Sequence, residues 1–150
     1  MTAHSDLHFE PVSDEDFEDL LLLRIEAMRD SLERIGRFDP VRARERFRFS
    51  FSAAHTRHIF ADDKWVGFVA VKPIEEGLLL DHLYIRPAFQ NRGIGARVLE
   101  QVFAQADSAG QALRVGALRE SDSNRFYLRH GFVKINEDEW DIYYVRQPAA

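Results

Sequence analysis

The spacing of apolar residues along the chain predicts two amphipathic helices. Apolar side chains recur three and four residues apart after Ser13 and again after Gly93, which is typical of helices with one buried face. Ser13 and Asp16 have the spacing of a capping box at the start of the first helix. Gly36 and Gly110 follow the last apolar residues and mark where the two helices end.

The segment Val41 to Phe51 has two interpretations. Asp39 followed by Pro40 is typical of a helix start, with an N-cap before a proline at the first helical position. The alternation of polar and aromatic residues from Arg46 onward would equally suit a strand. The start signal favours the helix, and the strand stays open as an alternative.

Extended segments account for most of the remaining pattern. We expect strands at His8–Val12, Arg57–Ala61, Trp65–Val71, Leu78–Ile85, Ala112–Leu118, Phe132–Asn136 and Trp140–Val145. Pro73 should stop the third of these strands, and Leu78–Ile85 is so apolar that it should lie centrally in the sheet. A short helix is expected at Ser123–His130. Since helical crossovers require some parallel pairing, the predicted class is mixed α/β, nearer α+β.

Composition and charge narrow the class of protein. The 150 residues, 45% hydrophobic and 30% charged, suit one globular domain over residues 1–150. The absence of cysteine excludes disulfides, thiolate zinc sites and a cysteine nucleophile. A net charge of −5 argues against a general nucleic-acid binder and leaves room for a cationic acceptor. Without a long apolar run or a signal-peptide pattern, we expect a cytoplasmic protein with no membrane partner.

The segment Gln90–Ala96 carries the clearest chemical signal. It joins a predicted buried strand to the start of a predicted helix, where free backbone N–H groups favour an anion. Gly93 and Gly95 would let a phosphate approach the backbone, and Arg92 and Arg97 would add charge-assisted hydrogen bonds. The alternative is a glycine-rich turn with exposed arginines. A P-loop is excluded because no Gly-Lys pair occurs, and the dinucleotide pattern GxGxxG is incomplete.

This loop resembles the acyl-CoA loop of the GNAT N-acyltransferase superfamily. Gln90, Gly93 and Gly95 match the fixed positions of the family pattern Q/R-x-x-G-x-G/A. The segment Asn124–Phe132 is similar, in shortened form, to the family's N-x-x-x-x-x-Y-x-x-x-G-F theme. The resemblance covers residues 65–145. It implies a GNAT-like mixed central sheet of about seven strands with about four helices, and a splayed parallel pair at the cofactor site.

The resemblance also implies acetyl-CoA as cosubstrate and no metal. In the family the loop amides hold the pyrophosphate and a strand edge pairs with the pantetheine arm. The residues implied to bind the cofactor are Leu83, Ile85, Gln90, Asn91, Arg92, Gly93, Ile94, Gly95, Ala96, Arg97, Asn124 and Tyr127.

Two side chains are candidates for catalysis. Tyr127 matches the family's tyrosine beside the thioester sulfur, where a general acid would protonate the departing thiolate. The alternative is an aromatic side chain that only packs in a short helix. Asp81 matches a strand position where family members carry a residue facing the acceptor, so it is the candidate for handling the amine proton; the alternative is a structural aspartate. His82 should face the other side of the strand and be structural.

The acceptor is expected to be an amine of a small molecule or a peptide. In the family the two helices before the first hairpin cover the acceptor pocket. Candidate specificity residues there are Glu26, Arg29, Arg37, Arg42, Arg44, Arg46 and Arg48, although a solvated helix face explains most of them. An arginine that points inward would favour an acceptor with a carboxylate, because the guanidinium pairs with it bidentately.

The predicted function is therefore an N-acetyltransferase in which the amine attacks acetyl-CoA directly. The alternative is a non-catalytic acyl-CoA sensor or regulatory module that retains the phosphate loop. The final strand, Trp140–Val145, could be an edge that pairs with a second copy in a homodimer, or it could be covered within its own subunit.

Overall fold

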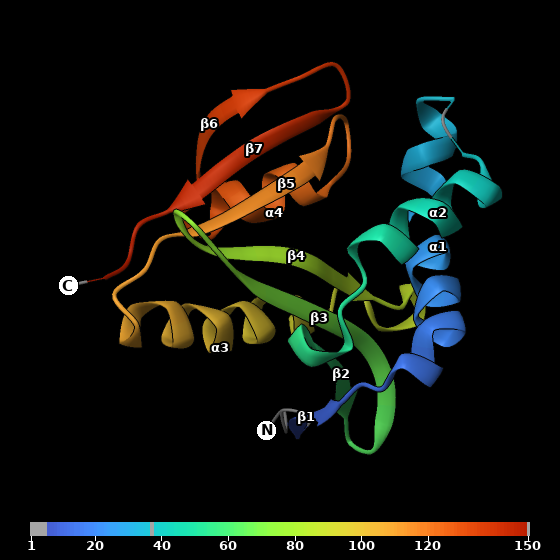
Figure 1. The fold of residues 1–150 in the computed structure, drawn as a ribbon, viewed down its shortest axis with the longest axis horizontal. Helices are drawn as coiled ribbons and strands as arrows, with labels where there is room; N and C mark the ends of the chain where they lie inside the picture. The colour runs from blue at the N-terminus through green and yellow to red at the C-terminus, as the bar shows by residue number, and fades with distance from the viewer. Residues whose placement is uncertain (1–5, 37, 150) are drawn as a thin grey trace. The chain divides into compact units, whose positions relative to one another are not determined.

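The protein is described by a computed structural model that covers residues 6–36 and 38–149. Its described helices are α1 (Phe17–Arg34), α2 (Pro40–Ser50), α3 (Ile94–Ser108) and α4 (Ser123–Arg129), with short 3-10 turns η1 (Asp14–Asp16), η2 (Ala53–His55) and η3 (Pro87–Phe89). Its described strands are β1 (Leu7–Pro11), β2 (Thr56–Ala61), β3 (Lys64–Ile74), β4 (Gly77–Ile85), β5 (Leu113–Leu118), β6 (Val133–Glu137) and β7 (Asp141–Arg146). The strands form one seven-stranded sheet in the order β1-β2-β3-β4-β5-β7-β6 (Figure 1). The predicted mixed α+β class is confirmed, and β4 is the central strand, as expected.

The chain divides into two compact units. The first unit contains the described residues up to Ala70 together with His82–Arg92, and the second contains Val71–Asp81 and the described residues from Gly93 onward. Strands β3 and β4 each contribute residues to both units. The single domain over residues 1–150 stays a prediction, and each unit is described by itself below.

In the first unit, the helices begin where the local start signals place them. The backbone N–H of Ser13 donates to the Asp16 carboxylate at 2.9 Å and completes the capping box before α1. The Asp39 carboxylate accepts from the backbone N–H groups of Val41 and Arg42, so it caps α2. The cap explains why this segment is a helix, and the strand alternative is wrong.

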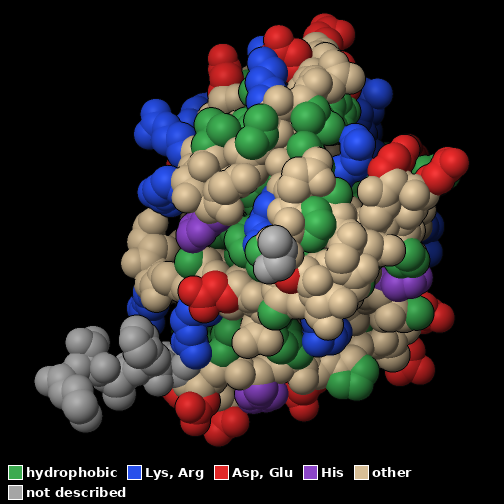
Figure 2. Space-filling model, turned by 90° about the vertical axis from the view of Figure 1, so that its left-hand side faces the viewer, with side chains coloured by type: hydrophobic (Ala, Val, Ile, Leu, Met, Phe, Trp, Pro, Cys, Tyr) green, Lys and Arg blue, Asp and Glu red, His purple; other side chains and the backbone are tan. Residues whose placement is uncertain are grey.

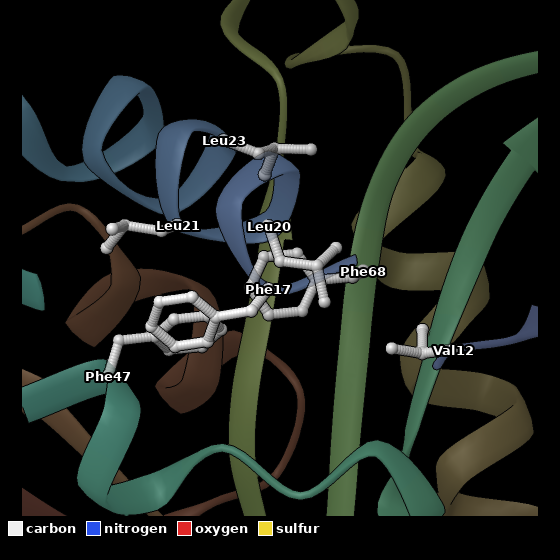
Figure 3. Packing of buried hydrophobic residues seen from close by; sticks show 7 residues of the cluster. All are labelled: Val12, Phe17, Leu20, Leu21, Leu23, Phe47 and Phe68. Carbon is white, nitrogen blue, oxygen red and sulfur yellow. The ribbon is translucent and has the colours of Figure 1, made fainter. Parts of the chain in front are cut away.

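The core of the first unit is aromatic. Phe47 from α2 is fully buried and packs against both Phe17 of α1 and Phe68 of β3, with ring centroids 5.2 and 5.8 Å away (Figure 3). Leu20 adds a fully buried aliphatic side chain from α1. Burying one such side chain contributes about 1.5 to 3 kcal/mol, so these contacts hold α1 and α2 against β3.

In the second unit, α3 buries one stripe of side chains. This stripe consists of Ile94, Val98, Leu99, Val102 and Ala106, as predicted from their spacing. Strand β4 pairs with β5 in parallel, in a register that joins Leu78–Leu80 to Leu113–Val115. The remainder of β4 belongs to the first unit, so the expected splay of the pair stays a prediction.

One strand prediction is wrong, and for the last strand the structure decides between the two alternatives, because the strand is covered within its own subunit. Strand β3 does not stop before Pro73 but continues to Ile74. Its pairing with β2 reaches only Ala70, and a proline without an N–H group is tolerated where one side of a strand is open. Strand β7, which replaces the predicted Trp140–Val145, is not an edge, because it lies between β5 and β6 (Figure 1). The edge strand next to β7 is β6, and every residue of β6 is exposed.

Candidate active site

The predicted phosphate loop leads into α3 through left-handed backbone positions. Asn91 has a φ of 63° and Gly93 a φ of 78°. Gly93 is the N-cap of α3, and no side chain caps the first turn of this helix. The backbone N–H groups of this turn therefore have the arrangement that binds anions at helix starts.

The two glycines of the loop have different roles in the structure. A Cβ on Gly93 would meet no atom within 4 Å, so glycine is favoured there by its positive φ. A Cβ on Gly95 would lie 3.2 Å from the Phe126 ring of α4, so this glycine makes room for a side chain. Both glycines were expected to let a phosphate approach the backbone. At Gly95 the structure adds another cause, because the absence of a side chain lets α3 pack on α4 within the second unit.

The loop residues that belong to the first unit contact neighbouring residues of β4 and η3. The Gln90 amide nitrogen donates to the backbone carbonyl of Ile85 at 2.8 Å. This bond engages one backbone group that was expected to pair with pantetheine. The Arg92 guanidinium lies 5.5 Å from the centroid of the Phe89 ring and is exposed. Arg92 is thus available to an anion in solution while the aromatic ring orients it.

Tyr127 lies on α4 in the second unit and is only 6% exposed. Its ring packs edge-on against Phe132, with centroids 5.3 Å apart, and lies tilted against Tyr144, with centroids 6.3 Å apart. The Tyr144 hydroxyl donates to the Asn124 side-chain oxygen at 2.7 Å, and burial raises the pKa of Tyr144, which keeps this donor protonated. The surrounding rings therefore fix the orientation of Tyr127.

Asn124 is engaged at both ends of its side chain. Its amide nitrogen donates to the backbone carbonyls of Leu118 and Ser121, at 2.9 and 3.0 Å, and its oxygen accepts from Tyr144. These bonds tie the end of β5 to the start of α4. The structure thus gives Asn124 a positioning role beside the predicted contact with the cofactor.

Asp81 forms an ion pair in the second unit. Its carboxylate lies 2.7 Å from the ammonium group of Lys72, and the two side chains are 19% and 22% exposed. Because the Asp81 side chain is 19% exposed, it remains in contact with solvent.

His82 belongs to the first unit and is 7% exposed. Its ring lies 5.2 Å from Phe47 and 5.7 Å from Tyr84, and its Nε2 forms a hydrogen bond of 3.1 Å with the Ser50 hydroxyl. This packing supports the expectation that His82 is structural.

The candidate specificity residues on α1 and α2 lie mostly on solvated faces. Arg29 pairs with Glu33, and Arg44 pairs with Glu18. Arg48 lies over the ring of Phe17, 4.4 Å from its centroid. The exposed members of the set are Glu26, Arg29, Arg42, Arg44, Arg46 and Arg48. Arg37 lies outside the described residues.

One arginine that the sequence analysis missed does face the core of the first unit. The Arg24 guanidinium carbon lies 6.0 Å from the centroid of Phe47 and 5.8 Å from that of Tyr84. A signal was present in the sequence, because Arg24 follows Leu20 by four residues and Leu21 by three, on the apolar stripe of α1.

The described residues were compared with two further kinds of feature, a metal site and a membrane-spanning helix. No group of three or more His, Asp or Glu side chains among them could hold a metal ion. None of the described helices combines the length and the apolar character that crossing a membrane requires. Figure 2 shows acidic and basic side chains interspersed on the face in view.

Comparison with known proteins identifies the family. The family model described as an acetyltransferase (GNAT) domain matches residues 54–134, which is more than half of the chain. A search of curated proteins finds no match.

Solved structures share the fold. A PaiA N-acetyltransferase from Thermoplasma acidophilum, solved in complex with coenzyme A, has a TM-score of 0.76 at 20% identity, covering 95% of this chain and 99% of the other. An acetyltransferase from Thermus thermophilus has a TM-score of 0.72 at 22% identity, covering 97% and 99%. A GCN5-related N-acetyltransferase from Rhodopseudomonas palustris has a TM-score of 0.77 at 16% identity, covering 98% and 99%.

Proposed function

The chain belongs to the GNAT acetyltransferase family, and from this premise we propose that it transfers the acetyl group of acetyl-CoA to a primary amine of a small molecule or a peptide. The start of α3 carries the proposal. Its first turn has no side-chain cap, it follows two residues with positive φ, and Arg92 is exposed beside it. These features suit the pyrophosphate of CoA.

The remaining cofactor contacts are assigned by the family pattern. The loop residues Gln90–Arg97 would bind the phosphates, and the backbone of Leu83 and Ile85 would pair with pantetheine. The bond between Gln90 and Ile85 supports a fixed geometry between the strand end and the loop. Asn124 would orient α4 toward the cofactor.

Acetyl transfer then proceeds by direct attack. The amine nitrogen bonds to the thioester carbon, a tetrahedral intermediate forms, and the C–S bond breaks as the thiolate leaves. A strand N–H group would hold the oxyanion. Because the sequence contains no cysteine, no cysteinyl thioester intermediate is available.

Two side chains handle the protons of this reaction. The Tyr127 hydroxyl gives its proton to the departing thiolate, and the orientation fixed by Phe132 and Tyr144 supports this role. An alkylamine has a pKa near 10 and is mostly protonated at neutral pH, so it must lose a proton before attack. The Asp81 carboxylate accepts or relays this proton, and its partial exposure beside Lys72 supports the role because solvent reaches it.

Thiol release from acetyl-CoA tests the proposal over a panel of amines, amino acids, polyamines and peptides. We expect amine-dependent release above the rate with acetyl-CoA alone, together with an acetylated amine detected by mass spectrometry. CoA binding measured by calorimetry provides the second readout. Binding of CoA without turnover on any acceptor would contradict the proposal and favour the sensor or regulatory module.

A further inference from the structure

Arg24 differs from the other described arginines of α1 in its surroundings. Its guanidinium adjoins the rings of Phe47 and Tyr84, and its Nε is buried. Within residues 6–36 and 38–149, this Nε has no hydrogen-bond partner and the guanidinium has no ion pair. By contrast, Arg29 on the same helix pairs with Glu33.

A guanidinium in such a place is costly unless an anion pairs with it. Arginine stays charged, and a buried N–H donor without an acceptor loses the hydrogen bond that water would have given it. The aromatic rings offset part of this loss through cation–π attraction. The two aromatic rings lie near the guanidinium carbon, but an aromatic ring is not a strong hydrogen-bond acceptor for the N–H groups. An acceptor supplied from outside the chain would complete the site.

We propose that Arg24 binds a carboxylate of the acceptor, so that the substrate is an amine that also carries a carboxylate, such as a free amino acid. This inference rests on the proposed acetyl transfer and names the class of acceptor. The planar guanidinium matches a carboxylate with two parallel N–H···O bonds. Arg24, Tyr84 and Ser50 are partly exposed, so solvent reaches this part of the first unit.

The surroundings of Arg24 in the first unit favour an anion over a second cation. The rings of Phe47 and Tyr84, which adjoin Arg24, have described ring contacts in turn with non-acidic side chains, namely Phe17, Phe51, Phe68 and His82. A polyamine would bring a positive charge toward the guanidinium with no carboxylate among these neighbours to offset it. A single carboxylate balances the single charge of Arg24.

The test compares L-amino acids with the corresponding amino-acid amides as acceptors. The amide retains the shape and the amine but removes the carboxylate charge. Because amidation also changes the pKa of the amine, the readout is how the ratio of kcat/KM values for acid and amide changes between variants. Arg24→Gln removes the charge, Arg24→Lys retains it without the planar fork, and Arg34→Gln is an exposed control on the same helix.

We expect Arg24→Gln to raise KM for the amino acid about 10- to 100-fold and to leave KM for the amide nearly unchanged. Arg24→Lys should retain part of the preference, and Arg34→Gln all of it. Thermal unfolding of each variant separates a loss of fold from a loss of recognition. If Arg24→Lys and Arg24→Gln both unfold, protection of the native protein against thermal unfolding by the amino acid, but not by the amide, replaces the kinetic test.

Several results would overturn the inference. The first is equal kcat/KM for amino acids and their amides in the native protein, and the second is an equal loss of kcat/KM for both in Arg24→Gln. The third is thermal protection that does not distinguish the amino acid from the amide. The fourth is weaker CoA binding in Arg24→Gln, which would assign Arg24 to the cofactor. Failure of the proposed function looks different, because no acceptor of any class would then be acetylated while the protein remains folded.

Discussion

Replacing Tyr127 with phenylalanine removes one oxygen atom and leaves the aromatic ring in place. The ring is 6% exposed and packs against Phe132 and Tyr144, at centroid distances of 5.3 and 6.3 Å. Because phenylalanine has the same ring and the same rotamers, these contacts survive the substitution. The variant therefore separates the chemistry of the hydroxyl from the packing of the side chain.

The expected effects on stability and on turnover differ in size. Removal of the polar hydroxyl from a side chain that is 6% exposed changes the free energy of unfolding by about 1 kcal/mol. In a chain of this length that corresponds to a change in Tm of roughly 2 to 4 °C. Loss of a general acid lowers kcat by about 10² to 10⁴, or roughly 2.7 to 5.5 kcal/mol in the activation free energy. The larger effect is thus on the reaction.

The assay measures thiol release at saturating acetyl-CoA and acceptor, with CoA affinity measured by calorimetry. Tyr143→Phe is the matched control, because its hydroxyl also forms a hydrogen bond within the second unit, to the Asp138 carboxylate at 2.6 Å, and the proposed mechanism uses neither residue. We expect the control to lose stability by about 1 kcal/mol and to retain turnover within a few fold. If Tyr127→Phe retains turnover within threefold, or if both variants lose turnover equally, Tyr127 is not the general acid.

Three further substitutions test other parts of the structure. Asp81→Asn should lower kcat at least about 10²-fold, whereas Lys72→Met should change it much less; equal losses in both would reduce Asp81 to a structural partner. Gly93→Ala should lower the free energy of unfolding in urea by about 1 kcal/mol and Gly93→Asn by less, because asparagine tolerates a positive φ; equal losses would contradict a backbone cause. The hydrogen bond from the backbone of Ser13 lowers the pKa of Asp16, so its carboxylate stabilises the fold above the unfolded value of 3.8, and this contribution is lost as pH falls through the lower folded pKa. Asp16→Asn should therefore reduce stability by about 0.5 to 1 kcal/mol at pH 7, and the difference should shrink in urea titrations below pH 4.

Features of the fold that depend on a few neighbouring residues could be predicted. Three helix starts illustrate this. Side chains bond to backbone N–H groups at Ser13 and Asp39, whereas the start of α3 at Gly93 has no side-chain cap, and each effect lies within one helical turn. Their effect is local, so the sequence alone carries it. The same holds for the apolar stripe of α3.

The end of β3 and the position of β7 in the sheet depend on partners that are distant in the sequence. Pro73 is compatible with β3 only because pairing with β2 ends at Ala70, and no local pattern contains that register. Strand β7 lies between β5 and β6, although a hairpin of β6 and β7 is equally compatible with β6 beside β5. Local alternation predicts that a strand exists but not which neighbour it selects.

The same distinction separates the donor side of the proposed reaction from the acceptor side. The donor features lie in one loop and one short helix, so a pattern of spaced residues was enough to propose acetyl-CoA. The acceptor feature, Arg24, depends on rings from α2 and β4 that adjoin α1 only in the folded first unit. An arginine on an apolar stripe is the one trace that such an arrangement leaves in the sequence, since a charge there lowers stability unless a partner or a ligand compensates it. Substrate class in this chain is therefore to be sought among residues that break a packing pattern, and Arg24 is where that reasoning leads.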